Sequence, residues 1–177
     1  NSQGKVRAFK LDLSKRASIE AFAKEVQGQL SHIDVLINNA GMIMNERQVN
    51  EWGVEMTMAV NHYGHFLLTY LLFPLVAKAK EGRIISVSSE AHKHTSLAPS
   101  SDLAGEQSWS SRAFYSKSKL ANVQFTVGLA DRLSKYPNIK AMSLHPGIVN
   151  SDFAERTPCC SFLGIFKCLC CCCYVDT

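Results

Sequence analysis

Short apolar runs alternate with segments of helical periodicity along most of this 177-residue chain. The runs end at polar or glycine-containing segments, as buried strands do, and the apolar residues between them recur at helical spacing. This alternation predicts an α/β fold with a doubly wound parallel sheet. The predicted strands are residues 6–11, 34–37, 83–87 and 139–144, and the predicted helices are residues 15–30, 51–80 and 114–133, with an interruption near residues 61–64.

Polar residues collect where the predicted strands end. In a parallel sheet the carboxyl ends of the strands share one edge, and ligands of such folds bind outside that edge. We therefore expect the polar segments that follow the strands to form one site. These segments are Asp12, residues 38–41, Ser89 and residues 145–147.

Composition narrows the class of protein. The net charge is only +4 and no block of lysine and arginine stands out, so nucleic-acid binding is not expected. No apolar run reaches the roughly 18 residues of a membrane-spanning helix. All seven cysteines fall between Cys159 and Cys173, which is not a disulfide framework and favours a reducing compartment. We divide the chain into a partial domain, residues 1–158, and a second segment, residues 159–177, which is a cysteine-rich tail or the start of a substrate loop.

Tyr115 and Lys119 stand four residues apart and so share one face of the predicted helix. A phenol is a poor base at neutral pH, but an ammonium about 4 Å away is expected to lower its pKa by about two units. Such a phenol can take the hydroxyl proton of an alcohol that loses hydride. Ser89 can supply a hydroxyl to the substrate oxygen, and Asn61 can hold a water that relays the proton outward.

These residues occur in a characteristic order. The turn Asn-Asn-Ala-Gly at residues 38–41 is followed by Ser89, then by Tyr-Ser-Lys-Ser-Lys at residues 115–119, then by His-Pro-Gly-Ile-Val at residues 145–149. The ordered set resembles the short-chain dehydrogenase/reductase family, whose fold is Rossmann-like. The segments at residues 60–69, 102–106 and 115–122 look like its retinol-dehydrogenase-like branch.

The resemblance implies a role for each matching residue. Tyr115 is expected to be the general acid/base, Ser89 to orient the substrate oxygen, Lys119 to bind the nicotinamide ribose and Asn61 to anchor the relay water. Ser151 stands where the family usually has threonine, and Met142 where many members have asparagine. The cofactor, NADP or NAD, is expected to contact Asp12, Leu13, Asn39, Ala40, Gly41, Tyr115, Lys119, Val149 and Ser151; no metal ligands are expected.

The family holds the cofactor pyrophosphate in a glycine-rich turn, and this sequence has no such turn. We therefore expect the sheet to be incomplete at the amino end and also at the carboxyl end, as in a fragment of a longer protein. The resemblance implies a hydride-transferring oxidoreductase with a small lipophilic alcohol/carbonyl substrate of retinol, steroid or other lipid type. A catalytically silent binding or scaffold module is the alternative, and a homodimer remains open.

The tail leaves three interpretations open. Clustered cysteines beside a short apolar patch suit S-palmitoylation, thiolates also bind zinc or copper, and the tail could be inert. Acylation would place the protein at the cytoplasmic face of an internal membrane, and otherwise we expect it in the cytoplasm. A membrane-tethered interaction protein is a further alternative that only the tail suggests.

Overall fold

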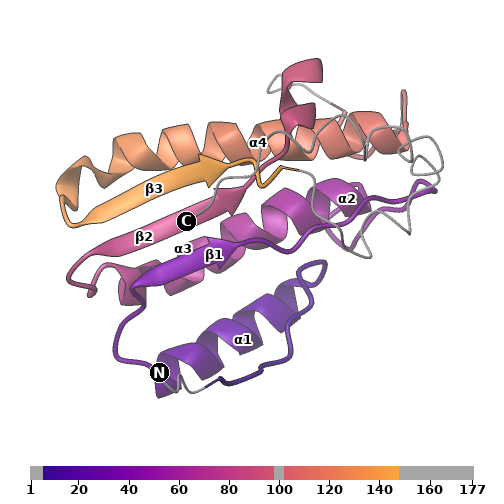
Figure 1. Ribbon diagram of the computed structural model, residues 1–177. Helices are drawn as coiled ribbons and strands as arrows, with labels where there is room; N and C mark the ends of the chain where they lie inside the picture. Colours follow the sequence, from indigo (N-terminus) through magenta and orange to yellow (C-terminus); the bar gives the residue numbers. More distant parts are fainter. Residues whose placement is uncertain (1–5, 98–101, 148–177) are drawn as a thin grey trace.

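A three-stranded parallel sheet forms the centre of the molecule in this computed structural model, which describes residues 6–97 and 102–147 (Figure 1). The strands are β1 (Val35–Asn38), β2 (Gly82–Val87) and β3 (Ile139–Leu144), in the order β1-β2-β3. Asn38 pairs with Ser86, and Val87 pairs with Leu144. Three of the four predicted strands are therefore confirmed, and their carboxyl ends share one edge.

The predicted strand at residues 6–11 is wrong. These residues have no strand partner, and the side chain of Val6 is 94% exposed. They run instead along helix α1 (Arg16–Gln29), where the rings of Phe9 and Phe22 meet edge-on with centroids 6.0 Å apart. An apolar run becomes a strand only beside a hydrogen-bonding neighbour, and β1 is the last strand on this side of the described sheet.

Helices α3 (His65–Val76) and α4 (Ser111–Arg132) pack against one face of the sheet, whereas α1 packs beside α3 and beyond β1 (Figure 1). The side chains between the layers are apolar and mostly buried, since alternate residues of each strand point to the same face. Within the described residues, none of these helices is long and apolar enough to cross a membrane. The residues at the contact of α3 and α4 with the sheet include Leu36, Phe73, Val76, Ile84, Leu129, Leu133, Ile139 and Ala141.

The opposite face of the sheet carries apolar residues that are open to solvent in the described structure. Val35 and Ile37 on β1 and Met142 on β3 are exposed at positions that alternate with the packed ones. The run at residues 34–37, which was predicted to be a buried strand, is thus buried on one face only.

The long helix predicted over residues 51–80 is interrupted where the sequence indicated. It consists of α2 (Met56–Met58), a π-helix η1 (Ala59–Gly64) and α3. A π-turn inserts an extra residue per turn, which redirects side chains and is common at functional sites. Gly64 allows this turn to approach the preceding loop, because a Cβ at Gly64 would lie 2.4 Å from the carbonyl oxygen of Leu13.

Short helical turns and caps complete the arrangement. A 3₁₀ turn η2 (Glu90–His94) follows β2, and another, η3 (Leu133–Lys135), follows α4. Helix α4 begins after Ser110, whose side chain accepts a hydrogen bond from the main-chain N–H of Ala113. This cap fixes the first turn of the helix that carries Tyr115.

Candidate active site

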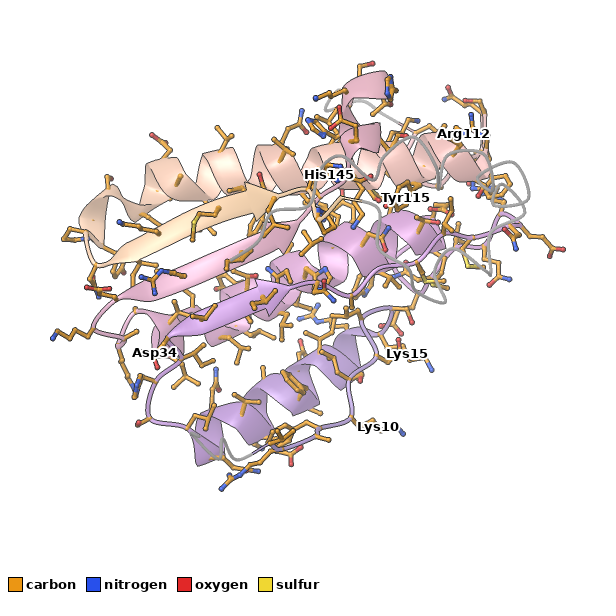
Figure 2. All side chains as sticks on the ribbon, viewed as in Figure 1. Lys10, Lys15, Asp34, Arg112, Tyr115 and His145 are labelled. Carbon is orange, nitrogen blue, oxygen red and sulfur yellow. The ribbon has the colours of Figure 1, made fainter. Side chains whose placement is uncertain are left out.

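The structure brings most of the predicted site residues to the carboxyl edge of the sheet. Residues 39–41 follow β1, Ser89 follows β2 and His145 follows β3, while α4 supplies Tyr115 (Figure 2). The labelled side chains of Tyr115 and His145 lie at the same end of the sheet in this view. Val149 and Ser151, the two predicted contacts of the nicotinamide carboxamide, lie outside the described residues.

Ser88 and Ser89 point in different directions, and Ser89 faces the tyrosine. The hydroxyl of Ser88 is buried and donates to the main-chain oxygen of Lys119 at 2.8 Å. The hydroxyl of Ser89 hydrogen-bonds the phenol of Tyr115 and accepts from the main-chain N–H of Ala91 at 3.3 Å. Ser89 is therefore the serine that can share a substrate oxygen with Tyr115.

Lys119 lies beside Tyr115, as their spacing predicted. Its ammonium nitrogen is 5.7 Å from the centroid of the Tyr115 ring and donates to the main-chain oxygen of Val87 at 3.0 Å. The side chain is only 4% exposed, and this burial lowers the pKa of Lys119 to about 8. Within the described residues Val87 is its one hydrogen-bond acceptor, although an ammonium carries three N–H donors.

The expected effect of Lys119 on the phenol is not what the structure shows. Burial raises the pKa of Tyr115 above its usual value, and the hydrogen bond from Ser89 lowers it only in part. The Lys119 ammonium lies 5.7 Å from the centroid of the ring, and burial has the larger influence on the phenol. Tyr115 is consequently protonated at neutral pH in this structure.

Asn61 lies in the π-turn and is fully buried, and its side-chain amide hydrogen-bonds other residues of the protein. Its Oδ1 accepts from the N–H of Met42 at 2.7 Å, and its Nδ2 donates to the oxygen of Met42 at 2.9 Å and to the hydroxyl of Ser118 at 3.0 Å. The amide thereby fixes the main chain just after the turn at residues 39–41. A relay water on this side chain, as the resemblance implied, would have to share an oxygen already in use.

Gly41 leaves room beside both Asn61 and Lys119. A Cβ at Gly41 would lie 3.5 Å from Oδ1 of Asn61 and 3.5 Å from the ammonium of Lys119. Residues 39–41 are exposed, so this space is open to a ligand. Sugar hydroxyls of a nucleotide could occupy this open space and accept from the two Lys119 N–H groups that have no acceptor among the described residues. The residues here therefore fit a nicotinamide cofactor.

The loop that carries Asp12 and Leu13 does not follow a strand, and it contacts the π-turn at Gly64. Leu13 is buried and abuts Gly64. The carboxylate of Asp12 accepts from the hydroxyl of Ser14 at 2.6 Å, and this bond is the main cause that lowers the pKa of Asp12. Leu13 therefore lies against the π-turn that carries Asn61, and Asp12 precedes it in the same loop.

Several residues that support the site were missed by sequence reasoning. The imidazole of His65 is 5% exposed and bonds the main-chain oxygen of Asn61 at 3.2 Å. His62 bonds the side chain of Asn122, and Asn122 in turn bonds Val87. The sequence signal for these residues was the presence of polar side chains in two largely apolar helical segments. A polar side chain buried in such a segment needs a hydrogen-bond partner.

No group of histidine, cysteine, aspartate and glutamate side chains within residues 6–97 and 102–147 is arranged to hold a metal ion. The cysteines themselves lie outside the described residues.

Comparison with known proteins agrees with this geometry. The sequence profile of the short chain dehydrogenase family matches residues 1–158. Human retinol dehydrogenase 11 is 43% identical over 157 residues, which cover 89% of this chain and 48% of that protein. Human retinol dehydrogenases 14 and 12 are each 42% identical, covering 86% and 89% of this chain and 45% and 48% of theirs. The chain thus spans about half the length of the curated relatives it matches.

Solved structures show the same fold. An uncharacterized protein from Mycobacterium paratuberculosis superposes with a TM-score of 0.72 and 36% identity, covering 86% of this chain and 54% of that one. A metagenomic short-chain oxidoreductase in complex with NADP superposes with a TM-score of 0.61 and 27% identity, covering 84% and 62%. The predicted α/β, Rossmann-like fold is confirmed, and the chain belongs to the short-chain dehydrogenase family. Within that family it falls in the retinol-dehydrogenase-like branch.

Proposed function

We propose that the protein containing this chain is a nicotinamide-dependent oxidoreductase that interconverts a lipophilic alcohol and its carbonyl. The observation that carries the proposal is the hydrogen bond between Ser89 and Tyr115, with the ammonium of Lys119 beside the phenol ring. These groups stand at the carboxyl edge of a parallel sheet, where ligands of this fold bind. The similarity to retinol dehydrogenases supports a lipophilic substrate.

The cofactor is proposed to be NADP or NAD, and it supplies or accepts the hydride when bound. The open space at Gly41 would receive its ribose, and the two N–H donors of Lys119 that have no acceptor among the described residues would bond sugar hydroxyls. Asn39 and Ala40 are proposed to line the adenosine side, with Asp12 and Leu13 at the adenine. The NADP complex of a related oxidoreductase favours NADP.

Tyr115 is proposed to move the proton of the substrate oxygen. Because burial raises its pKa, the phenol carries its proton at neutral pH and can donate it to a developing alkoxide. Ser89 would hold the same oxygen from the other side, as a second hydrogen-bond donor.

Asn61 is proposed to act on the site by fixing the main chain rather than by carrying a water on its amide. Its three hydrogen bonds join Met42, which follows the cofactor turn, to Ser118 on the helix of Tyr115. The distance between the two halves of the site therefore depends on this one buried side chain.

The cysteine-rich tail, residues 159–177, is proposed to be acylated and to hold the protein at the cytoplasmic face of an internal membrane. Two acyl chains suffice for stable anchoring, since each buried CH₂ contributes about 0.8 kcal/mol. Hydroxylamine cleaves thioesters, so treatment should release the protein from isolated membranes. An unchanged membrane fraction and mass would rule out acylation.

The activity is tested by incubating the whole protein with reduced NADP or NAD and either retinal or a short aliphatic aldehyde. We expect the absorbance of the reduced nicotinamide to fall with retinal and to change far less with the short aldehyde, because the lipophilic tail supplies binding energy. No consumption of either cofactor with any carbonyl would overturn the proposal. A preference for the short aldehyde would still support an oxidoreductase but would refute the proposed lipophilic substrate.

A further inference from the structure

The ammonium of Lys119 is held at the end of a chain of three hydrogen bonds. The main-chain oxygen of Val87 accepts from this ammonium at 3.0 Å and from the Nδ2 of Asn122 at 3.2 Å. The Oδ1 of Asn122 faces the Nδ1 of His62 at 3.1 Å. Lys119 and Asn122 lie on successive turns of α4 and meet at Val87, the last residue of β2, whereas His62 lies in the π-turn and contacts Asn122.

The chain of contacts determines where the proton of His62 lies. An amide has an accepting oxygen on one side and a donating nitrogen on the other, so only the nitrogen of Asn122 can face the oxygen of Val87. The amide oxygen must then face His62, which requires the Nδ1 of that ring to carry hydrogen. Any other tautomer of neutral His62, or a flipped amide, brings two acceptors together.

The surroundings of His62 hold its ring in this position. It meets the rings of Tyr63 and Phe125 edge-on, with centroids 4.9 and 6.2 Å away, and Phe66 lies 6.4 Å away. Burial lowers the pKa of His62, so the ring is neutral at physiological pH. Asn122 is 3% exposed, and therefore no bulk water competes for its amide.

We propose that His62 is a positioning residue for the hydride-transfer site, acting through the amide of Asn122 and the carbonyl of Val87 to fix the ammonium of Lys119. The Nδ1–H of His62 fixes the orientation of the Asn122 amide. The amide nitrogen then donates to the carbonyl oxygen of Val87, and the same oxygen accepts from the ammonium of Lys119. The effect on cofactor binding rests on the proposed function, whereas the hydrogen-bond chain itself does not.

The proton on His62 is read directly by nitrogen-15 NMR of the imidazole in the whole protein at neutral pH. The chemical shifts of the two ring nitrogens distinguish the tautomers, and we expect His62 in the Nδ1–H form. The Nε2–H form, or rapid averaging between the two, would overturn the proposal. This readout needs neither cofactor nor turnover.

Two variants of His62 test the consequence for Lys119. His62→Leu removes the donor and should weaken cofactor binding roughly tenfold by calorimetry, the effect of losing one well-placed hydrogen bond. His62→Asn keeps an N–H near the position of Nδ1 and should restore most of the affinity. Equal loss in both variants would overturn the positioning role.

Thr126→Val is the matched control, because it deletes another buried hydrogen bond to the same asparagine. Its hydroxyl donates to the main-chain oxygen of Asn122 at 2.8 Å, not to the amide. We expect a lower melting temperature with unchanged cofactor affinity; weakened affinity in this variant would show that general destabilisation accounts for the effect and would refute the proposal. If the unaltered protein bound no cofactor, the proposed function would fail, and the tautomer alone would decide the inference.

Discussion

Replacing His65 should change how the stability of the protein depends on pH. The imidazole is 5% exposed, bonds the main-chain oxygen of Asn61 and packs in the π-turn. Burial is the largest cause that lowers the pKa of His65 from 6.5 to about 4, and the positive charge of Lys119 contributes. The folded state therefore prefers the neutral ring.

The sign and size of the effect follow from proton linkage. Since the folded pKa lies below the unfolded value, the neutral ring gives its full stability above pH 6.5 and loses it as the pH falls toward 4. The difference between the two pKa values is worth about 3 kcal/mol, and about 2 kcal/mol of this should be lost by pH 5. This is a large share of the typical free energy of unfolding of a domain.

The assay is urea denaturation of the whole protein, followed by circular dichroism at pH 8 and pH 5. His65→Asn keeps an N–H near Nδ1 but does not titrate, so its loss of stability between these pH values should be about 2 kcal/mol smaller than that of the unaltered protein. His94→Asn, at an exposed position, should behave as the unaltered protein does. Equal pH dependence in all three proteins would refute the reasoning about His65.

Three further substitutions test separate parts of the site. Gly64→Ala should cost about 1–3 kcal/mol in a thermal or urea melt, because its Cβ would lie 2.4 Å from the oxygen of Leu13; a neutral effect would contradict the close approach. Gly41→Ala should fold normally, with Cβ contacts of 3.5 Å, but should weaken cofactor binding in calorimetry; unchanged affinity would argue against the cradle. Ser89→Ala removes the bond that lowers the pKa of Tyr115, so the loss of carbonyl reduction at alkaline pH should move to higher pH; an unmoved or lowered profile would contradict this contact.

The sequence predicted those parts of the fold that depend on local patterns. The strands near residues 34–37, 83–87 and 139–144 and the helix of Tyr115 are marked by apolar runs and helical periodicity, and the structure has them close to the predicted bounds. The failure at residues 6–11 has a non-local cause. The run is apolar enough for a strand, but strand formation depends on a neighbour that no local pattern describes.

The site was predicted less completely than the fold. Spacing alone places Lys119 beside Tyr115, but it does not reveal how deeply the phenol is buried, and burial decides the direction of its pKa. The contact between Asn61 and Met42 could not be predicted either. Asn61 bonds the main-chain N–H and oxygen of Met42, which every residue except proline has. Roles for Val149 and Ser151 remain predictions outside the described residues.

The central claim is that Tyr115 transfers the proton that accompanies hydride transfer. It is tested with reduced nicotinamide cofactor that carries deuterium at the transferred position, supplied to the whole protein with retinal. Tyr63→Phe is the control, since it removes the hydroxyl of a second partly buried tyrosine.

The unaltered protein and Tyr63→Phe should give alcohol that carries one deuterium, measured by mass spectrometry. Tyr115→Phe should form it at least about a hundredfold more slowly, the usual loss for a general acid, while the protein still unfolds cooperatively and still binds the cofactor. Deuterated product at an undiminished rate from Tyr115→Phe would contradict the account.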